Sequence, residues 1–130
     1  MKRKFFHWLP AIVWAIGLFI LSAWTSPPKV GEAMPHMDKA VHWILFSGQC
    51  WFVALALRRS HKLTLPATLA FAILIASAYG AVDEFHQRFV PHRTCDIADW
   101  VADTLGAAAG AAAFYVYESK RSAKANQQSA

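Results

Sequence analysis

The sequence predicts an all-α fold, a bundle of four transmembrane helices with the N-terminus and the C-terminus both in the cytoplasm. Three observations carry this prediction: four apolar runs of about bilayer length, a lack of the alternation typical of strands, and basic residues gathered at one end of the runs. The 130 residues suit one domain. A hydrophobic content of 56% and a mean hydropathy of +0.28 are high for a soluble domain.

The first two runs cover residues 5–24, FFHWLPAIVWAIGLFILSAW, and residues 40–57, AVHWILFSGQCWFVALAL. A helix needs about 20 apolar residues to cross a bilayer core. Because the first run follows the basic start MKRK, a cleaved signal peptide is the alternative. Its apolar part would be about 7–15 residues, shorter than this run, and SAWTS is a poor cleavage site. We therefore expect an uncleaved helix.

The third and fourth runs cover residues 63–82 and 97–117. Pro66 falls in the first turn of the third run, where its missing N–H matters little. Asp96 precedes the fourth run and suits a helix N-cap better than a catalytic role. Backbone groups in lipid must find hydrogen bonds within their own segment, so all four runs are expected to be helices. Residues 1–118 form the membrane domain, and residues 119–130 are expected to be a disordered cytoplasmic tail.

The charged residues indicate the orientation. The N-terminus, the 58–62 connection and the C-terminal tail hold nine bases and one acid: Lys2, Arg3, Lys4, Arg58, Arg59, Lys62, Lys120, Arg121, Lys124 and Glu118. The other side holds four bases and seven acids: Lys29, Lys39, Arg88, Arg93, Glu32, Asp38, Asp83, Glu84, Asp96, Asp99 and Asp103. Basic loops stay in the cytoplasm, which places both termini there. The net charge of +5 is spread over short segments with no folded domain, so we expect no nucleic-acid partner.

The two cysteines, Cys50 and Cys95, have no CxxC or zinc-site spacing, and Cys50 lies deep in its run. We expect both to be free thiols. The sequence also lacks HExxH and similar ligand spacings, so it predicts no metal site and no cofactor.

The second and third helices each place polar side chains near the non-cytoplasmic end. Residues three, four or seven apart share a helix face. The polar positions are Asp38, His42 and Gln49 in the second helix, and Tyr79, Asp83 and His86, with Glu84 and Gln87 beside them, in the third. Asp38 equally suits an N-cap, and Gln49 equally suits a hydrogen bond to another helix.

In the fourth helix, Asp99 and Asp103 share a face that continues through Gly106 and Gly110. Gly106 and Gly110 form a Gly-xxx-Gly motif, which lets membrane helices pack closely. The face with both aspartates should therefore press against a neighbouring helix, where its charges meet protein groups and not lipid.

Asp103 lies about 10 Å beyond the start of the fourth helix, within the outer leaflet, where a charge costs about 2.5–3.5 kcal/mol. We expect Arg93 or His42 to be its partner. A buried ion pair that only locks the bundle explains a few such charges but not the whole set. The sequence therefore predicts an outward polar pocket around Asp38, Lys39, His42, Asp83, Glu84, His86, Gln87, Arg93, Asp99 and Asp103.

Two segments, DKAVHWILFSG at Asp38–Gly48 and YGAVDEFHQRFVPHRTCDIADWVADTLGAAAG at Tyr79–Gly110, resemble the VanZ-like family of bacterial membrane proteins. The resemblance extends from the end of the first helix through the fourth. The matching positions are Asp38, Lys39, His42, Asp83, Glu84, Gln87, Phe89, Pro91, Arg93, Asp99, Asp103, Gly106 and Gly110. The chain departs from the family pattern at His92, where Gly is frequent, and at Asp103, where many members have Asn.

This resemblance implies an envelope role at the outer leaflet of the bacterial cytoplasmic membrane. The family takes its name from a glycopeptide-resistance cluster, in which its member favours teicoplanin resistance. The resemblance implies no particular reaction.

Three functions fit the predicted pocket. The favoured one is binding of a lipid head group, a lipid-linked cell-wall precursor or a lipophilic glycopeptide, with Arg93 and Lys39 meeting phosphate. The second is an enzyme acting on a lipid-linked substrate by acid–base or metal-assisted chemistry, for which the catalytic candidates are Glu84, His42, Asp83 and His86. The third is a small transporter or proton relay, for which four short helices leave little room unless the chain forms oligomers.

Overall fold

The computed structural model describes residues 2–25, 37–61 and 63–128, and these residues contain four helices and no strand. The helices are α1 (Lys2–Ser22), α3 (Met37–Ser60), α4 (Leu65–Gln87) and α5 (Ile97–Gln128). The predicted all-α fold with four helices is confirmed. Lys29, Glu32 and Lys62, which belong to the predicted charge distribution, lie outside the described residues.

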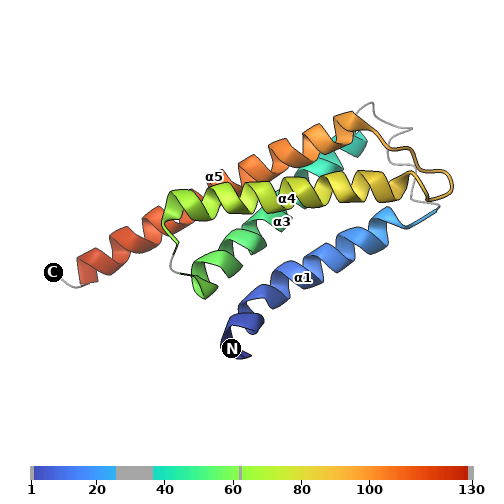
Figure 1. The fold of residues 1–130 in the computed structure, drawn as a ribbon. Coiled ribbons are helices and arrows are strands. Elements are labelled where there is room, and N and C mark those ends of the chain that lie inside the picture. The colour runs from blue at the N-terminus through green and yellow to red at the C-terminus, as the bar shows by residue number, and fades with distance from the viewer. Residues whose placement is uncertain (1, 26–36, 62, 129–130) are drawn as a thin grey trace.

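Successive helices run in opposite directions, as Figure 1 shows. The ends of α1 and α4 therefore lie at the same end of the bundle as the starts of α3 and α5. We call this the polar end, because it gathers most of the acidic residues of the helices, namely Asp38, Asp83, Glu84, Asp99 and Asp103. We call the opposite one the basic end. Helix α3 packs against each of the other three helices.

The closest helix pair is α3 with α5, and glycine makes this closeness possible. Gly106 and Gly110 of α5 lie against the backbone of α3, where an added Cβ would overlap the carbonyl oxygens of Trp43 and Ser47. The Ser47 hydroxyl donates a hydrogen bond across the contact to the Gly106 carbonyl at 2.8 Å. Such contacts between small residues replace the hydrophobic driving force that helices lack in lipid.

Among the described residues, three helices are long and apolar enough to cross a membrane: α1 over Lys4–Ser22, α3 over Met37–Ser60 and α4 over Leu65–Gln87. Their outer faces carry exposed apolar side chains such as Ile20 and Leu74, as lipid contact requires. Helix α5 packs against α3 and α4 but is less apolar, because alanine, glycine and two aspartates fill its first half. The span predicted at 97–117 stays a prediction.

Residues 119–128, which we expect to be a disordered tail, continue α5 to Gln128 in the structure. Lys, Arg, Ala and Gln in this segment are good helix formers. Glu118 also fixes the preceding turn, since it accepts hydrogen bonds from Arg58 of α3 and from Arg121 of α5.

Candidate functional site

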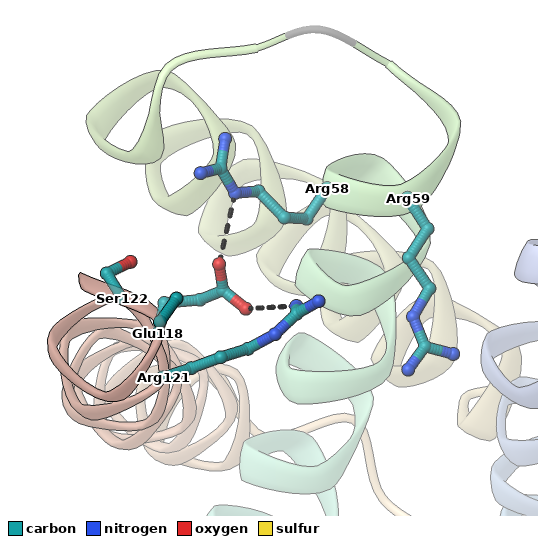
Figure 2. Close-up of a pocket in the computed structure, with 6 residues that line it drawn as sticks. Arg58, Arg59, Glu118, Arg121 and Ser122 are labelled. Atoms are coloured by element: carbon teal, nitrogen blue, oxygen red, sulfur yellow. Dashed lines mark hydrogen bonds and ion pairs between the residues drawn. The ribbon is translucent and has the colours of Figure 1, made fainter. Parts of the chain in front are cut away.

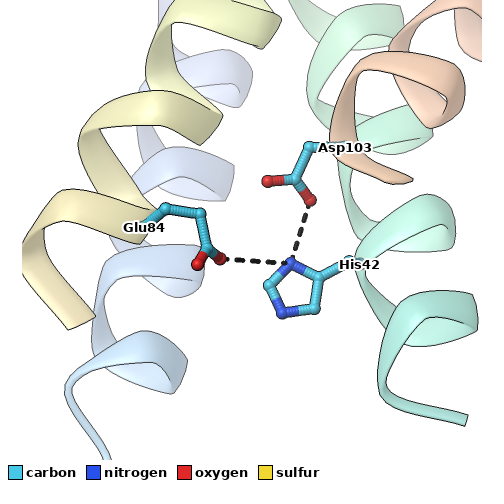
Figure 3. A group of neighbouring side chains, drawn as sticks. All are labelled: His42, Glu84 and Asp103. Carbon is cyan, nitrogen blue, oxygen red and sulfur yellow. Dashed lines mark hydrogen bonds and ion pairs between the residues drawn. The ribbon is translucent and has the colours of Figure 1, made fainter. Parts of the chain in front are cut away.

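Three helices bring His42, Glu84 and Asp103 together at the polar end, and we call these residues the triad (Figure 3). His42 Nδ1 lies 2.9 Å from Asp103 Oδ1 and 3.9 Å from Glu84 Oε1. The Asp103 side chain is fully buried, and the side chains of Glu84 and His42 are 5% and 16% exposed. The triad therefore places three ionisable side chains deep within the bundle.

Small residues make room for the Asp103 carboxylate. Gly106 lies one turn further along α5 and allows α3 to approach closely enough for His42 to reach Asp103. Gly80 of α4 faces the other side of the carboxylate, since a Cβ there would lie 2.8 Å from Asp103 Oδ2. The glycines therefore decide how closely the helices enclose the charged group.

Hydrogen bonds fix the orientation of Glu84. Its Oε2 accepts from the backbone N–H of Asp96 at 2.9 Å, and its Oε1 accepts from Gln87 Nε2 at 3.4 Å. The same Gln87 nitrogen donates to Asp83 Oδ2 at 3.1 Å. Within the described part of the chain, Asp83 Oδ1 and Asp103 Oδ2 are buried without a hydrogen-bond partner.

A second layer, which we call the rim, lies nearer the surface and centres on Lys39. Its Nζ donates to Asp99 at 2.9 Å, to Asp96 at 3.1 Å and to Asp38 at 3.3 Å. Side-chain exposure rises from 12% for Asp99 to 44% for Asp96 and 54% for Asp38. Asp96 also caps α5, because its Oδ1 accepts from the Ala98 N–H at 2.8 Å. This amide, together with Lys39, holds the pKa of Asp96 below its usual value.

Arg93 does not lie among the acids, which corrects the expectation that it pairs with Asp103. Its guanidinium donates to the carbonyl oxygens of Leu21 at 2.9 Å and Trp24 at 3.3 Å, at the end of α1. The last carbonyls of a helix lack partners within the helix and attract cations. Lys39 is the cation among the rim carboxylates instead, and His42 is the partner of Asp103.

His86 also lies apart from the triad. Its ring stacks on Phe19 with 4.5 Å between ring centroids, and its Nδ1 lies 3.4 Å from Ser22 Oγ. Tyr79, one heptad earlier, likewise faces α1 and donates to the Ala15 carbonyl at 2.7 Å. Residues two apart on a helix point in nearly opposite directions, so Glu84 and His86 cannot share a site. The face of α4 that turns toward His42 and Asp103 carries Asp83, Glu84 and Gln87 instead.

The basic end holds a second cluster, which lies outside the predicted set of site residues. Glu118 accepts from Arg58 Nε at 3.3 Å and from Arg121 Nη1 at 3.2 Å (Figure 2). These residues line a hollow of about 420 Å³ together with Arg59, Ser122 and Ala125. The sequence feature that marks this cluster is a lone acid, Glu118, among basic residues. Its role is to tie α5 to α3 at the end opposite the triad.

The triad offers two kinds of chemistry. His42 is held through Nδ1 by Asp103, and its Nε2 lies on the far side of the ring from both carboxylates (Figure 3). Such an oriented imidazole is able to act as a general acid or base. The three residues also bring one ligand atom each within 4.8 Å of one another, a set that suits a metal ion. Sequence spacing gives no sign of this set, because each member comes from a different helix.

Comparison with known proteins gives one match. The family model described as VanZ/LLP1 matches residues 3–118, which include the described parts of all four helices up to Glu118. No curated protein and no solved structure matches the chain. Because the family match covers most of the sequence, including the triad and the rim, the chain belongs to the VanZ/LLP1 family.

Proposed function

We propose that this VanZ/LLP1 protein spans the bacterial cytoplasmic membrane several times and binds the head of a lipid, a lipid-linked cell-wall precursor or a lipophilic glycopeptide at its outward polar end. One observation carries the proposal. The carboxylates of the polar end range from the exposed ones of the rim to the fully buried Asp103, inside a bundle whose helices α1, α3 and α4 are apolar enough to cross a membrane. Buried charge in a membrane bundle is costly and usually serves function. A role in glycopeptide resistance is part of the same proposal.

The charges decide which part of a ligand meets which residue. Lys39 already has three carboxylates within 3.3 Å, so the rim offers an incoming group mainly acceptors. Acceptors suit the hydroxyl and amide N–H groups of a sugar or peptide. Arg93 bonds neutral carbonyls at the end of α1 in the described structure, which leaves its charge available for a phosphate there.

Binding to a fluorescent lipid-linked cell-wall precursor tests this proposal, with the full chain reconstituted in nanodiscs. We expect Arg93→Gln to weaken binding by about 10-fold or more, because a hydrogen bond to a charged group contributes about 1.5–3 kcal/mol. Arg88→Gln is the matched control, since Arg88 is an exposed arginine at the same end of α4. Equal affinity of both variants, or no binding by the unmodified chain, would refute the proposal.

A second candidate function rests on the 2.9 Å contact between His42 and Asp103. In this alternative the protein is an enzyme, Asp103 orients the imidazole, and Nε2 exchanges a proton with a lipid-linked substrate. His42→Gln should then abolish turnover of a labelled precursor but leave its binding within about threefold. Turnover that survives in His42→Gln would exclude this mechanism.

The proposed orientation leads to a labelling prediction. Cys95 is exposed near the polar end, whereas Cys50 is fully buried in α3. A membrane-impermeant maleimide should therefore label the chain from the outside at Cys95. Ser122→Cys in a Cys95→Ser background should be labelled only after the membrane is permeabilised, because Ser122 lies at the basic end. The reverse pattern would place the triad on the cytoplasmic side.

A further inference from the structure

We propose that His42, Glu84 and Asp103 form a binding site for a divalent metal ion of the Zn²⁺ or Mn²⁺ class. The site goes beyond ligand binding at the rim and does not depend on it. Three observations support it: the spacing of the ligand atoms, a buried carboxylate oxygen without a partner, and an excess of buried negative charge.

The distances between the three ligand atoms are close to those found around a bound metal ion. Ligand atoms at about 2.1 Å from a metal lie about 3.0–4.2 Å from one another in tetrahedral or octahedral geometry. His42 Nδ1 lies 2.9 Å and 3.9 Å from the nearest Asp103 and Glu84 oxygens, and all three ligand atoms lie within 4.8 Å. Side-chain rotations that move the widest pair by about 1 Å suffice to close the shell. An imidazole nitrogen with two carboxylates is a ligand set that Zn²⁺ and Mn²⁺ accept.

The second observation concerns Asp103 Oδ2. This oxygen belongs to a residue that is 0% exposed. It has no hydrogen-bond partner in the described part of the chain. It points toward α4, the helix that carries Glu84 (Figure 3). Buried polar atoms nearly always find a partner, because burial without one costs free energy. A metal ion bound by the Asp103 carboxylate between α4 and α3 would compensate for this cost.

The third observation is the charge balance. Four carboxylates at the polar end are at most 9% exposed: Asp83, Glu84, Asp99 and Asp103. Among the described residues, the cationic side chains within 4 Å of them are Lys39, which Asp99 shares with the exposed Asp38 and Asp96, and His42. Buried charges require compensation by opposite charge or by a metal. A divalent cation at the triad supplies two positive charges where carboxylates outnumber bases.

Neighbouring hydrogen-bond donors also orient the Glu84 carboxylate, as metal sites require of their ligands. The Asp96 N–H and Gln87 Nε2 fix both oxygens of Glu84, and such outer partners orient ligating carboxylates. Metal binding would replace the proton that His42 Nδ1 shares with Asp103 and leave the N–H on Nε2. Three protein ligands leave at least one coordination position for water or a ligand group, as in catalytic metal sites.

The first experiment uses the unmodified chain. The full protein, purified in detergent and stripped with EDTA, is titrated with Co²⁺ and then with Zn²⁺, and its metal content is measured by mass spectrometry. We expect one equivalent per chain, a visible Co²⁺ absorption band that Zn²⁺ removes, and a higher unfolding temperature with metal. No band and no retained metal would overturn the proposal.

Substitutions then locate the site. Glu84→Gln and Asp103→Asn preserve side-chain shape, and each should weaken Co²⁺ binding by more than about 10-fold, beyond the loss typical of an outer partner. Asp99→Asn is the matched control, because it removes a nearly buried carboxylate of α5 that bonds Lys39 and lies outside the triad. Equal affinity in all three variants would place the metal elsewhere and overturn the proposal. If the EDTA-stripped chain still binds the lipid precursor but never binds metal, the metal site alone fails.

Discussion

His42→Leu is expected to destabilise the bundle by about 3–5 kcal/mol, because it removes the partner of a fully buried carboxylate. Asp103→Leu should cost less, about 1–3 kcal/mol, since an imidazole left without a partner is able to stay neutral. The double substitution of both residues by Leu should recover most of the loss. Well-packed apolar residues often replace a buried ion pair at no net cost.

A double-mutant cycle measures this prediction. The free energy of unfolding is determined by denaturant titration in detergent micelles with EDTA present, so that bound metal does not contribute. Arg88→Ala is the control and should change stability by less than about 0.5 kcal/mol, as surface substitutions do. Additive losses in the double variant would mean that His42 and Asp103 do not form an energetic pair.

Gly106→Ala and Gly110→Ala should each destabilise the bundle by about 1–3 kcal/mol or more, as overpacking of a tight contact does. The new methyl groups would overlap the carbonyl oxygens of Trp43 and Ser47, which are backbone atoms and cannot move without shifting α3. At Gly106 the same shift would also break the hydrogen bond from Ser47, so we expect the larger loss there.

Gly17→Ala is the matched control for the glycine contact. Apart from the adjoining residues and backbone of α1 itself, no atom lies within 4 Å of a Cβ built at Gly17. Alanine there should stabilise the helix by up to about 1 kcal/mol through its higher helix propensity. Unfolding curves that show the same loss for Gly17→Ala and Gly106→Ala would mean that close approach of α3 and α5 is not what the glycines provide.

The two proposals support each other at one point. An acidic rim and triad repel a phosphate, whereas a divalent cation at the triad would attract one. If both proposals hold, EDTA treatment should weaken binding of a phosphate-bearing lipid more than binding of its dephosphorylated form. The comparison uses the same nanodisc assay and no substitution, so folding defects do not affect it.

The sequence alone determined the helices and the ends at which charge gathers. Helices α1, α3 and α4 form where an apolar run meets the length that a bilayer requires. The observed bounds differ from the predicted ones mainly by extension into polar residues, furthest in α5, which continues to Gln128. Local signals were equally direct: Asp96 caps α5 through the Ala98 N–H, and the Gly106 and Gly110 positions mark a face without side chains. These features depend on neighbours within a few residues along the chain.

Only the tertiary structure decided which polar groups meet. Periodicity shows that Asp83 and His86 lie near one another on α4, but not that His86 packs on α1 while Glu84 turns toward α3 and α5. Periodicity also does not show that Arg93 caps the end of α1, or that Lys39 lies among the acids where Arg93 was expected. The rotation and register of each helix follow from packing, here from the glycine contact of α5 with α3. That contact brings His42 and Asp103 together and so forms the triad, because interactions between helices, unlike those within them, have no fixed spacing in the sequence.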